Sequence, residues 1–215
     1  MQEKLIIRQL GLQPYEPVWR AMQNFTDQRT CDSLDEIWLL EHEPVFTLGM
    51  NGKKEHILQA SLIPLVQIDR GGQVTYHGPG QLIAYLLIDL ARKKLGVRDL
   101  VDVIEQSLIA LLADLGIEAQ LRPKAPGVYV QEKKIAALGL RVRKGRSYHG
   151  LSLNVQMDLT PFQTINPCGY AGLGVTQIAD WLSPPPTKTL QQLLIDKLST
   201  GLGYNEISLS IGAIP

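Results

Sequence analysis

The chain has 215 residues, 45% of them hydrophobic, and its 21 Lys and Arg residues balance its 21 Asp and Glu residues. That length and composition suffice for one sizeable core. Zero formal net charge excludes binding to nucleic acid or anionic lipid that is driven by bulk charge.

The two cysteines, Cys31 and Cys168, lie far apart in the chain and outside any Cys/His cluster with ligand spacing. The sequence therefore excludes a disulfide framework and predicts no metal site. The N-terminal segment is unlike a signal peptide, and no apolar run approaches the ~20 residues of a membrane span. We expect a soluble, cytoplasmic protein.

The first half of the chain is patterned mainly as strands. "LIIRQL" predicts a strand, and residues 14–29 carry Tyr15, Trp19, Met22 and Phe25 at helical spacing. "EIWLLEH", "PVFTLG" and "PLVQID" predict strands, and "QVTYHGPGQLIAYLLIDL" predicts two more around a turn. Residues 99–115 form the clearest helix, with one apolar stripe and Gly116 as its stop signal.

The second half predicts strands near 127–131, 134–142 and 147–155, then a short helix at 175–182 and another at 189–199. "SPPPTK" is a stiff connector, too short for a domain boundary. The strands cluster instead of alternating with helices, and no GxGxxG follows the first strand, which disfavours a doubly wound dinucleotide fold. We therefore predict a single α+β domain over residues 1–215, with a mixed or antiparallel sheet and flanking helices. A short C-terminal tail starts at about residue 203, and "ISLSI" within it alternates like an edge strand.

Three stretches interrupt apolar strands with glycine and polar residues. In "DRGGQVTYHGPGQ" (69–81), Gly71 and Gly72 let the backbone approach a ligand, their N–H groups can bind a carbonyl oxygen, and His77 gives the turn an ionisable tip. The alternative interpretation of this stretch is a glycine-rich hairpin with a bulge.

In "KKIAALGLRV" (133–142), alternation places Lys134, Ala136, Leu138 and Leu140 on one strand face. Lys134 is either a strand-end lysine that reaches water or a partly desolvated amine with a lowered pKa. The basic run "RVRKGR" (141–146) is either a solvated strand end or loop, or a surface that docks a carrier.

In "TINPCGYAGLGVTQI" (164–178), Cys168 lies in a Pro-Cys-Gly turn, and a helix N-terminus or a cation near it would favour its thiolate. The alternative is an inert buried cysteine, which is what we expect of Cys31. A nucleophilic cysteine needs a base, and spacing does not choose one although chemistry alone favours a histidine. The candidate bases are His42, His56, His77, His149 and Lys134.

Together, "RGGQVTYHGPGQ", "KIAALG", "HGLSLNV" and "NPCG", with "EHEPVFTLG" before them, resemble the motifs of the lipoyl(octanoyl) transferase family, the octanoyl-[acyl-carrier-protein]:protein N-octanoyltransferases. Four motifs in one order are more specific than any one alone. The resemblance extends to about residue 182, and it implies the α+β fold of biotin and lipoate protein ligases.

The resemblance also implies a mechanism. Cys168 would attack the thioester of octanoyl-acyl carrier protein and hold the octanoyl group, and Lys134 would lower the pKa of the thiol or take its proton. A lysine of a lipoyl domain would then take the octanoyl group. The acceptors would be lipoyl domains of 2-oxoacid dehydrogenase E2 subunits and glycine cleavage H protein. No cofactor is implied, and we expect a monomer.

By the same resemblance, three motifs would line the acyl site. Their residues are Arg70, Gly71, Gly72, Gln73, Val74, Thr75, Tyr76, His77, Ala137, Leu138, Gly139, Gly150, Leu151 and Ser152. The family usually has alanine where this chain has Ser152, and an added hydroxyl beside an acyl chain weakens binding unless it finds a partner.

The chemistry fits these residue types. Exchange of one thioester for another is nearly balanced and amide formation runs downhill, so a nucleophile, a base and an oxyanion site suffice. Backbone N–H groups around Gly71, Gly72 and Gly139 are candidates for the oxyanion site. Three alternatives stay open: an ATP-dependent lipoate-protein ligase, a non-catalytic module that binds an acylated carrier or lipoyl domain, and a Cys-His hydrolase that uses His77 or His149.

Overall fold

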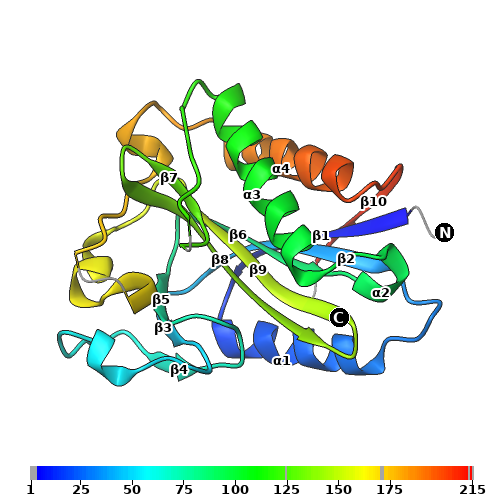
Figure 1. Ribbon diagram of the computed structural model, residues 1–215, viewed down its shortest axis with the longest axis horizontal. Coiled ribbons are helices and arrows are strands. Elements are labelled where there is room, and N and C mark those ends of the chain that lie inside the picture. Colours follow the sequence, from blue (N-terminus) through cyan, green and yellow to red (C-terminus); the bar gives the residue numbers. More distant parts are fainter. Residues whose placement is uncertain (1–3, 124, 170–171, 213, 215) are drawn as a thin grey trace.

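A mixed sheet forms the centre of the molecule (Figure 1). In the computed structural model, which describes residues 4–123, 125–169, 172–212 and 214 and only the backbone of Cys168, its seven strands are ordered β10-β1-β2-β6-β9-β8-β7. Their bounds are β1 (Lys4–Gln13), β2 (Asp35–His42), β6 (Gln81–Leu87), β7 (Val128–Val130), β8 (Lys133–Arg143), β9 (Arg146–Asn154) and β10 (Glu206–Ile211). β1 pairs in parallel with β2 and β10, and the other neighbours pair antiparallel.

A smaller sheet, ordered β4-β3-β5 in the described residues, consists of β3 (Val45–Leu48), β4 (Leu65–Gln67) and β5 (Val74–His77). β5 and β6 flank the His-Gly-Pro-Gly turn but belong to different sheets, so the hairpin interpretation of residues 69–81 is wrong. The carbonyl of Gly80 accepts hydrogen bonds from the N–H groups of Val155 and Gln156 at 3.2 and 3.0 Å. Gly80 has φ +82°, and a Cβ there would lie 1.9 Å from the Gln156 carbonyl oxygen. The turn therefore docks on the end of β9, which directs β6 into the larger sheet.

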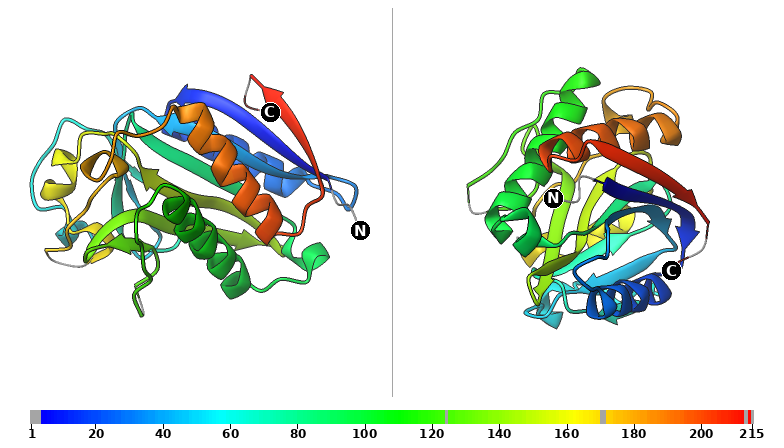
Figure 2. Two further views of the ribbon diagram at one scale, coloured as in Figure 1. Left: turned by 90° about the horizontal axis from the view of Figure 1, so that it is seen from above. Right: turned by 90° about the vertical axis from the view of Figure 1, so that its right-hand side faces the viewer.

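Helices cover both faces of the larger sheet (Figure 2). α1 (Tyr15–Gln28) packs with Trp38 and Tyr85 on one face, whereas α3 (Val97–Asp114) and α4 (Thr187–Gly201) pack on the other. α2 (Leu90–Lys93) follows β6, and short 3-10 turns span Lys54–His56, Thr160–Thr164, Pro167–Gly169 and Ile178–Asp180. No helix among the described residues is long and apolar enough to cross a membrane. The predicted α+β class with a mixed sheet and flanking helices is confirmed.

Two local predictions are wrong. The helix predicted at 175–182 is only the 3-10 turn Ile178–Asp180, because the chain before it is extended along β8. The amide of Lys134 donates to the Gly174 carbonyl at 2.9 Å, and the amide of Thr176 donates to the Lys134 carbonyl at 3.0 Å. Cys31, which we expected to be buried, is exposed in the turn between α1 and β2.

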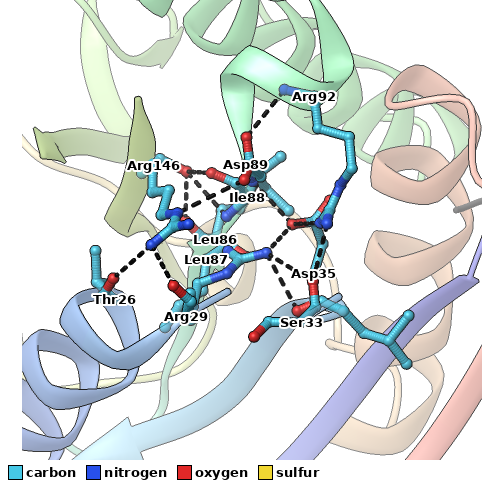
Figure 3. A network of polar contacts seen from close by, with 12 residues as sticks. Thr26, Arg29, Ser33, Asp35, Leu86, Leu87, Ile88, Asp89, Arg92 and Arg146 are labelled. Atoms are coloured by element: carbon cyan, nitrogen blue, oxygen red, sulfur yellow. Dashed lines mark hydrogen bonds and ion pairs between the residues drawn. The ribbon is translucent and has the colours of Figure 1, made fainter. Parts of the chain in front are cut away.

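A buried charge network at the start of β2 connects several elements (Figure 3). The carboxylate of Asp35, 1% exposed, accepts hydrogen bonds from Arg92 at 2.6 Å, from the Asp89 amide at 2.8 Å, and from Arg29 and Tyr204. Burial alone would raise the pKa of Asp35, but the hydrogen bonds from Arg92, Tyr204 and Arg29 lower it. Because a buried charge is tolerated only when it is paired, this network fixes α1, α2 and the end of α4 on one strand.

Candidate active site

A groove lies on the α1 face of the larger sheet, between that sheet and the loop that precedes β5. All the predicted acyl-site residues line it except Gly71 and Tyr76. The Gly71 amide donates instead to the Leu140 carbonyl at 3.1 Å. Tyr76 points away and packs against Phe46 and Phe162, as strand alternation requires when Thr75 and His77 face the groove.

Glycine lets backbone and side chains approach closely at this groove. Gly139 and Gly150 are register partners on β8 and β9. A Cβ at Gly150 would lie 2.1 Å from the Ala84 carbonyl oxygen, and one at Gly139 would lie 2.9 Å from Cδ of Arg70. The Arg70 guanidinium donates to the carbonyl and hydroxyl of Thr47 at 2.9 Å each, so this side chain braces the loop above the glycines.

Buried histidines and tyrosines cluster at the groove: Tyr15, Tyr85 and His77 line it, and the His42 ring packs against both tyrosines. His42 contacts the Gln13 carbonyl through Nδ1 at 3.0 Å and the Tyr85 hydroxyl through Nε2 at 2.7 Å. Because a carbonyl only accepts, Nδ1 carries the proton and Nε2 accepts from Tyr85. His77 contacts the Gln81 side-chain oxygen through Nδ1 at 2.7 Å. Burial lowers the pKa of His42 to about 4 and that of His77 to about 3, so both imidazoles are neutral at pH 7.

His149 is held by Asp69. Its Nε2 lies 2.9 Å from Oδ1 of Asp69, and the same carboxylate accepts from Trp19, Gln23 and Tyr148. Burial alone would raise the pKa of Asp69, but these four hydrogen bonds lower it well below its ordinary value. Nδ1 of His149 has no partner among the described residues, and its backbone has φ +60°. His149 pairs in register with Leu140, six residues along β8 from Lys134.

Lys134 is buried, with 4% of its surface exposed, so the strand-end interpretation is wrong. Its Nζ donates to the Pro126 carbonyl at 3.0 Å and lies 5.2 Å from the centroid of the Tyr129 ring. Gly127 makes room for it, since a Cβ there would lie 3.2 Å from Nζ. The structure therefore offers a desolvated amine in contact with a carbonyl and an aromatic ring.

Cys168 lies in the 3-10 turn Pro167–Gly169, and its side chain lies outside the described part of the chain. The following Gly169 has φ +79°, and a Cβ there would lie 3.1 Å from Cγ of Gln73. The chain then reaches Gly174, whose carbonyl binds the amide of Lys134. The segment that carries Cys168 is thus held beside Gln73 at one end and beside Lys134 at the other.

The basic run 141–146 forms the β8–β9 turn, where Arg143 pairs with Asp27 at 3.0 Å and Arg146 with Asp89 at 3.6 Å, which supports the strand-end interpretation. No group of three or more His, Cys, Asp or Glu side chains in the described residues could hold a metal ion.

Sequence reasoning assigned no site role to Tyr15, Ile83, Tyr85 or Asp69, although the first three line the groove. One signal was available for Asp69: a carboxylate stands directly before the Arg-Gly-Gly motif.

Comparison with known proteins gives one consistent result. The family model described as "Lipoyl protein ligase A/B catalytic domain" matches residues 14–199. The chain is 56% identical over 209 residues to the octanoyltransferase of Vibrio atlanticus, covering 97% of this chain and 95% of that protein.

Two groups of solved structures share the fold. The bi-partite lipoate protein ligase of Thermoplasma acidophilum superposes with a TM-score of 0.76 at 16% identity, over 99% of this chain and 88% of that chain. The biotin protein ligase of Aquifex aeolicus, solved with biotin and ATP, gives a TM-score of 0.57 at 13% identity, over 92% and 69%. Both similarities concern the fold alone, and they confirm the expected likeness to biotin and lipoate protein ligases.

Proposed function

This chain belongs to the octanoyltransferase family of enzymes, within the lipoyl protein ligase A/B catalytic domain family, and we propose that it moves an octanoyl group from octanoyl-acyl carrier protein to a lysine of lipoyl domains. The observation that carries the proposal is the glycine-walled groove together with the buried Lys134 beside the Cys168 segment. The acceptors we propose are lipoyl domains of 2-oxoacid dehydrogenase E2 subunits and glycine cleavage H protein. The monomeric state and the cytoplasmic location stay predictions.

In the first half-reaction, the thiol of Cys168 attacks the donor's thioester carbonyl, and Lys134 takes the thiol proton. A carbon–sulfur bond to Cys168 forms, and the donor's carbon–sulfur bond breaks. The departing thiolate receives its proton from Lys134. The burial of Lys134 and its backbone contacts with the segment that follows Cys168 support this role.

The tetrahedral intermediate needs hydrogen-bond donors for its oxyanion. Gly71 cannot serve as first expected, because its N–H is bound to the Leu140 carbonyl at 3.1 Å. The N–H of Gly72 has no acceptor among the described residues, and Gly72 lines the groove. We therefore assign the oxyanion contact to Gly72.

In the second half-reaction, the lysine amine of the acceptor attacks the acyl group on Cys168. An amide bond forms, the carbon–sulfur bond to Cys168 breaks, and Lys134 relays the amine proton to the thiolate. Conversion of a thioester to an amide runs downhill, so no nucleotide is consumed.

The octanoyl chain lies in the groove in this proposal. Glycine and aliphatic side chains form only part of its lining, which also includes Tyr15 and Tyr85. His77, which contacts Gln81 and also lines the groove, is neutral because burial lowers its pKa to about 3.

The decisive experiment is intact-mass measurement after the protein is mixed with octanoyl-acyl carrier protein, without ATP and without acceptor. We expect an octanoyl adduct that maps to Cys168 and disappears when a lipoyl domain is added. Cys168→Ser should lose the adduct, whereas the exposed Cys31→Ser serves as the matched control that keeps it. Lys134→Met should slow acylation by about 10²- to 10⁴-fold.

Each alternative gives a different result. Full activity in Cys168→Ala would refute the covalent mechanism. A requirement for ATP and a free acid would indicate the ligase, release of octanoate without acceptor would indicate the hydrolase, and binding without turnover would indicate the non-catalytic module.

A further inference from the structure

A second cavity adjoins the groove, and we call it the outer pocket. It has a volume of about 350 Å³ and opens at the start of α3. Its lining residues are Gly71, Gly72, Gln73, Val97, Val101, Ala125, Pro126, Lys134, Leu138, Gly139 and Leu140. No part of the predicted acyl site accounts for its walls at Val97, Val101, Ala125 and Pro126.

The groove and the outer pocket lie on opposite faces of β8. Leu138 and Leu140 pack against the cluster that contains α3, whereas the groove is lined by Tyr15 and Tyr85 of the cluster that contains α1. Figures 1 and 2 show α1 and α3 on the two sides of the sheet. The two cavities are therefore separated by the edge of β8.

They meet at one place along that edge, where both are lined by Gly72, Gln73, Leu138 and Gly139. On one side of this place β7 pairs with β8 as far as Ala136. On the other side, the hydrogen bond from Gly71 to the Leu140 carbonyl joins the loop to the strand. Between these two attachments the edge of β8 faces the loop at Gly72, the residue that we assign to the oxyanion.

In this arrangement the acyl part and the sulfur part of the donor thioester lie on opposite faces of β8. If the acyl chain lies in the groove and its carbonyl lies beside Gly72, the sulfur side of the thioester must leave by the other face. Lys134, which protonates that sulfur in the proposed mechanism, lines the outer pocket and not the groove. We propose that the outer pocket binds the pantetheine arm of the donor, an inference that rests on the proposed function.

The length of the pocket favours this occupant over the acceptor's lysine. Lys134 and Leu140 both line the pocket and lie six residues apart along β8, which is about 20 Å at the strand rise of about 3.3 Å per residue. A long arm with amide and gem-dimethyl groups suits that length and the apolar walls at Val97 and Val101. A lysine side chain with its four methylene groups spans only about 6 Å and would fill the Lys134 end alone.

The test is a substitution that narrows the outer pocket at its solvent-exposed mouth. Val97 is 48% exposed, so Val97→Trp fills the mouth of the outer pocket without disturbing the core. Gln106→Trp is the matched control, because Gln106 is an exposed position on the same helix outside the pocket. The measurement is the rate of Cys168 acylation by octanoyl-pantetheine thioester, divided by the rate with the short thioester octanoyl-N-acetylcysteamine.

We expect Val97→Trp to lower that ratio at least about tenfold and Gln106→Trp to leave it at the wild-type value. An unchanged ratio in Val97→Trp would overturn the inference. So would a variant that is acylated normally by both thioesters but transfers the octanoyl group slowly to the lipoyl domain, since the pocket would then receive the acceptor. Failure of the wild-type protein to be acylated by either thioester would instead refute the proposed function.

Discussion

Mild acid should destabilise this protein, because two histidines are buried in neutral form beneath the groove. Burial lowers the pKa of His42 from 6.5 to about 4 and that of His77 from 6.5 to about 3. The unfolded chain binds a proton at each position as the pH falls through 6.5, whereas the folded chain does not until much lower pH. The stability contributed by the two neutral imidazoles is therefore complete above pH 6.5 and is lost between 6.5 and their folded pKa values.

The size of the effect follows from these values. At about pH 5, 1.5 units below the ordinary pKa, each imidazole that stays neutral lowers the free energy of unfolding by about 2 kcal/mol. His42 and His77 together give a loss of about 4 kcal/mol relative to pH 7.5, a large part of the roughly 5–15 kcal/mol typical of a domain. His149, whose pKa burial also lowers, acts in the same direction.

The assay is urea unfolding at pH 7.5 and pH 5, followed by tryptophan fluorescence and extrapolated to water. In His42→Phe the difference between the two pH values should shrink by about 2 kcal/mol. For each protein, the free energy of unfolding at pH 5 is compared with its own value at pH 7.5. A change in packing that affects both values equally therefore cancels. A wild-type difference below about 1 kcal/mol would refute the conclusion that the folded state keeps these imidazoles neutral.

Gly150→Ala should destabilise the fold by about 3 kcal/mol or more in a thermal or urea melt, because its Cβ would lie 2.1 Å from the Ala84 carbonyl oxygen; an unchanged melt would contradict the close β6–β9 approach. Asp35→Asn should lower the free energy of unfolding by about 3–5 kcal/mol, since it leaves the buried Arg29 without its countercharge, and a loss below about 1 kcal/mol would mean that the network is not a buried ion pair. Ser152→Ala should lower KM for the octanoyl donor about two- to fivefold in steady-state transfer assays, because the groove wall becomes more apolar; a higher KM would mean that the hydroxyl binds substrate.

Local pattern was sufficient for most of the elements. The apolar stripe of residues 99–115 predicts α3, alternation predicts β8 and β9, and "ISLSI" forms the edge strand β10, because each signal is read from neighbours a few residues apart. The motifs also named most of the residues that line the groove. At Gly139 and Gly150 the reason is steric, because a Cβ there would collide with Arg70 or the Ala84 carbonyl oxygen.

Two of the errors arose where a distant partner decides the local structure. Residues 174–176 are extended because they hydrogen-bond to Lys134, some forty positions earlier, and no helical pattern reveals that. β5 and β6 separate into two sheets because Gly80 docks on the end of β9. Cys31 is exposed because the turn that carries it lies at the surface.

By itself, the sequence determined the class of the fold and the family, because composition, periodicity and motif order are properties of the chain alone. Only the tertiary structure showed where the candidate bases lie. It buries His42 and His77 in hydrogen bonds and fixes His149 on Asp69. It brings both Lys134 and His56 to the segment that carries Cys168, where a Cβ at Gly169 would lie 3.4 Å from Nε2 of His56. The physical reason is that proton affinity and reach depend on burial and distance, which are set only when strands far apart in the chain pack together.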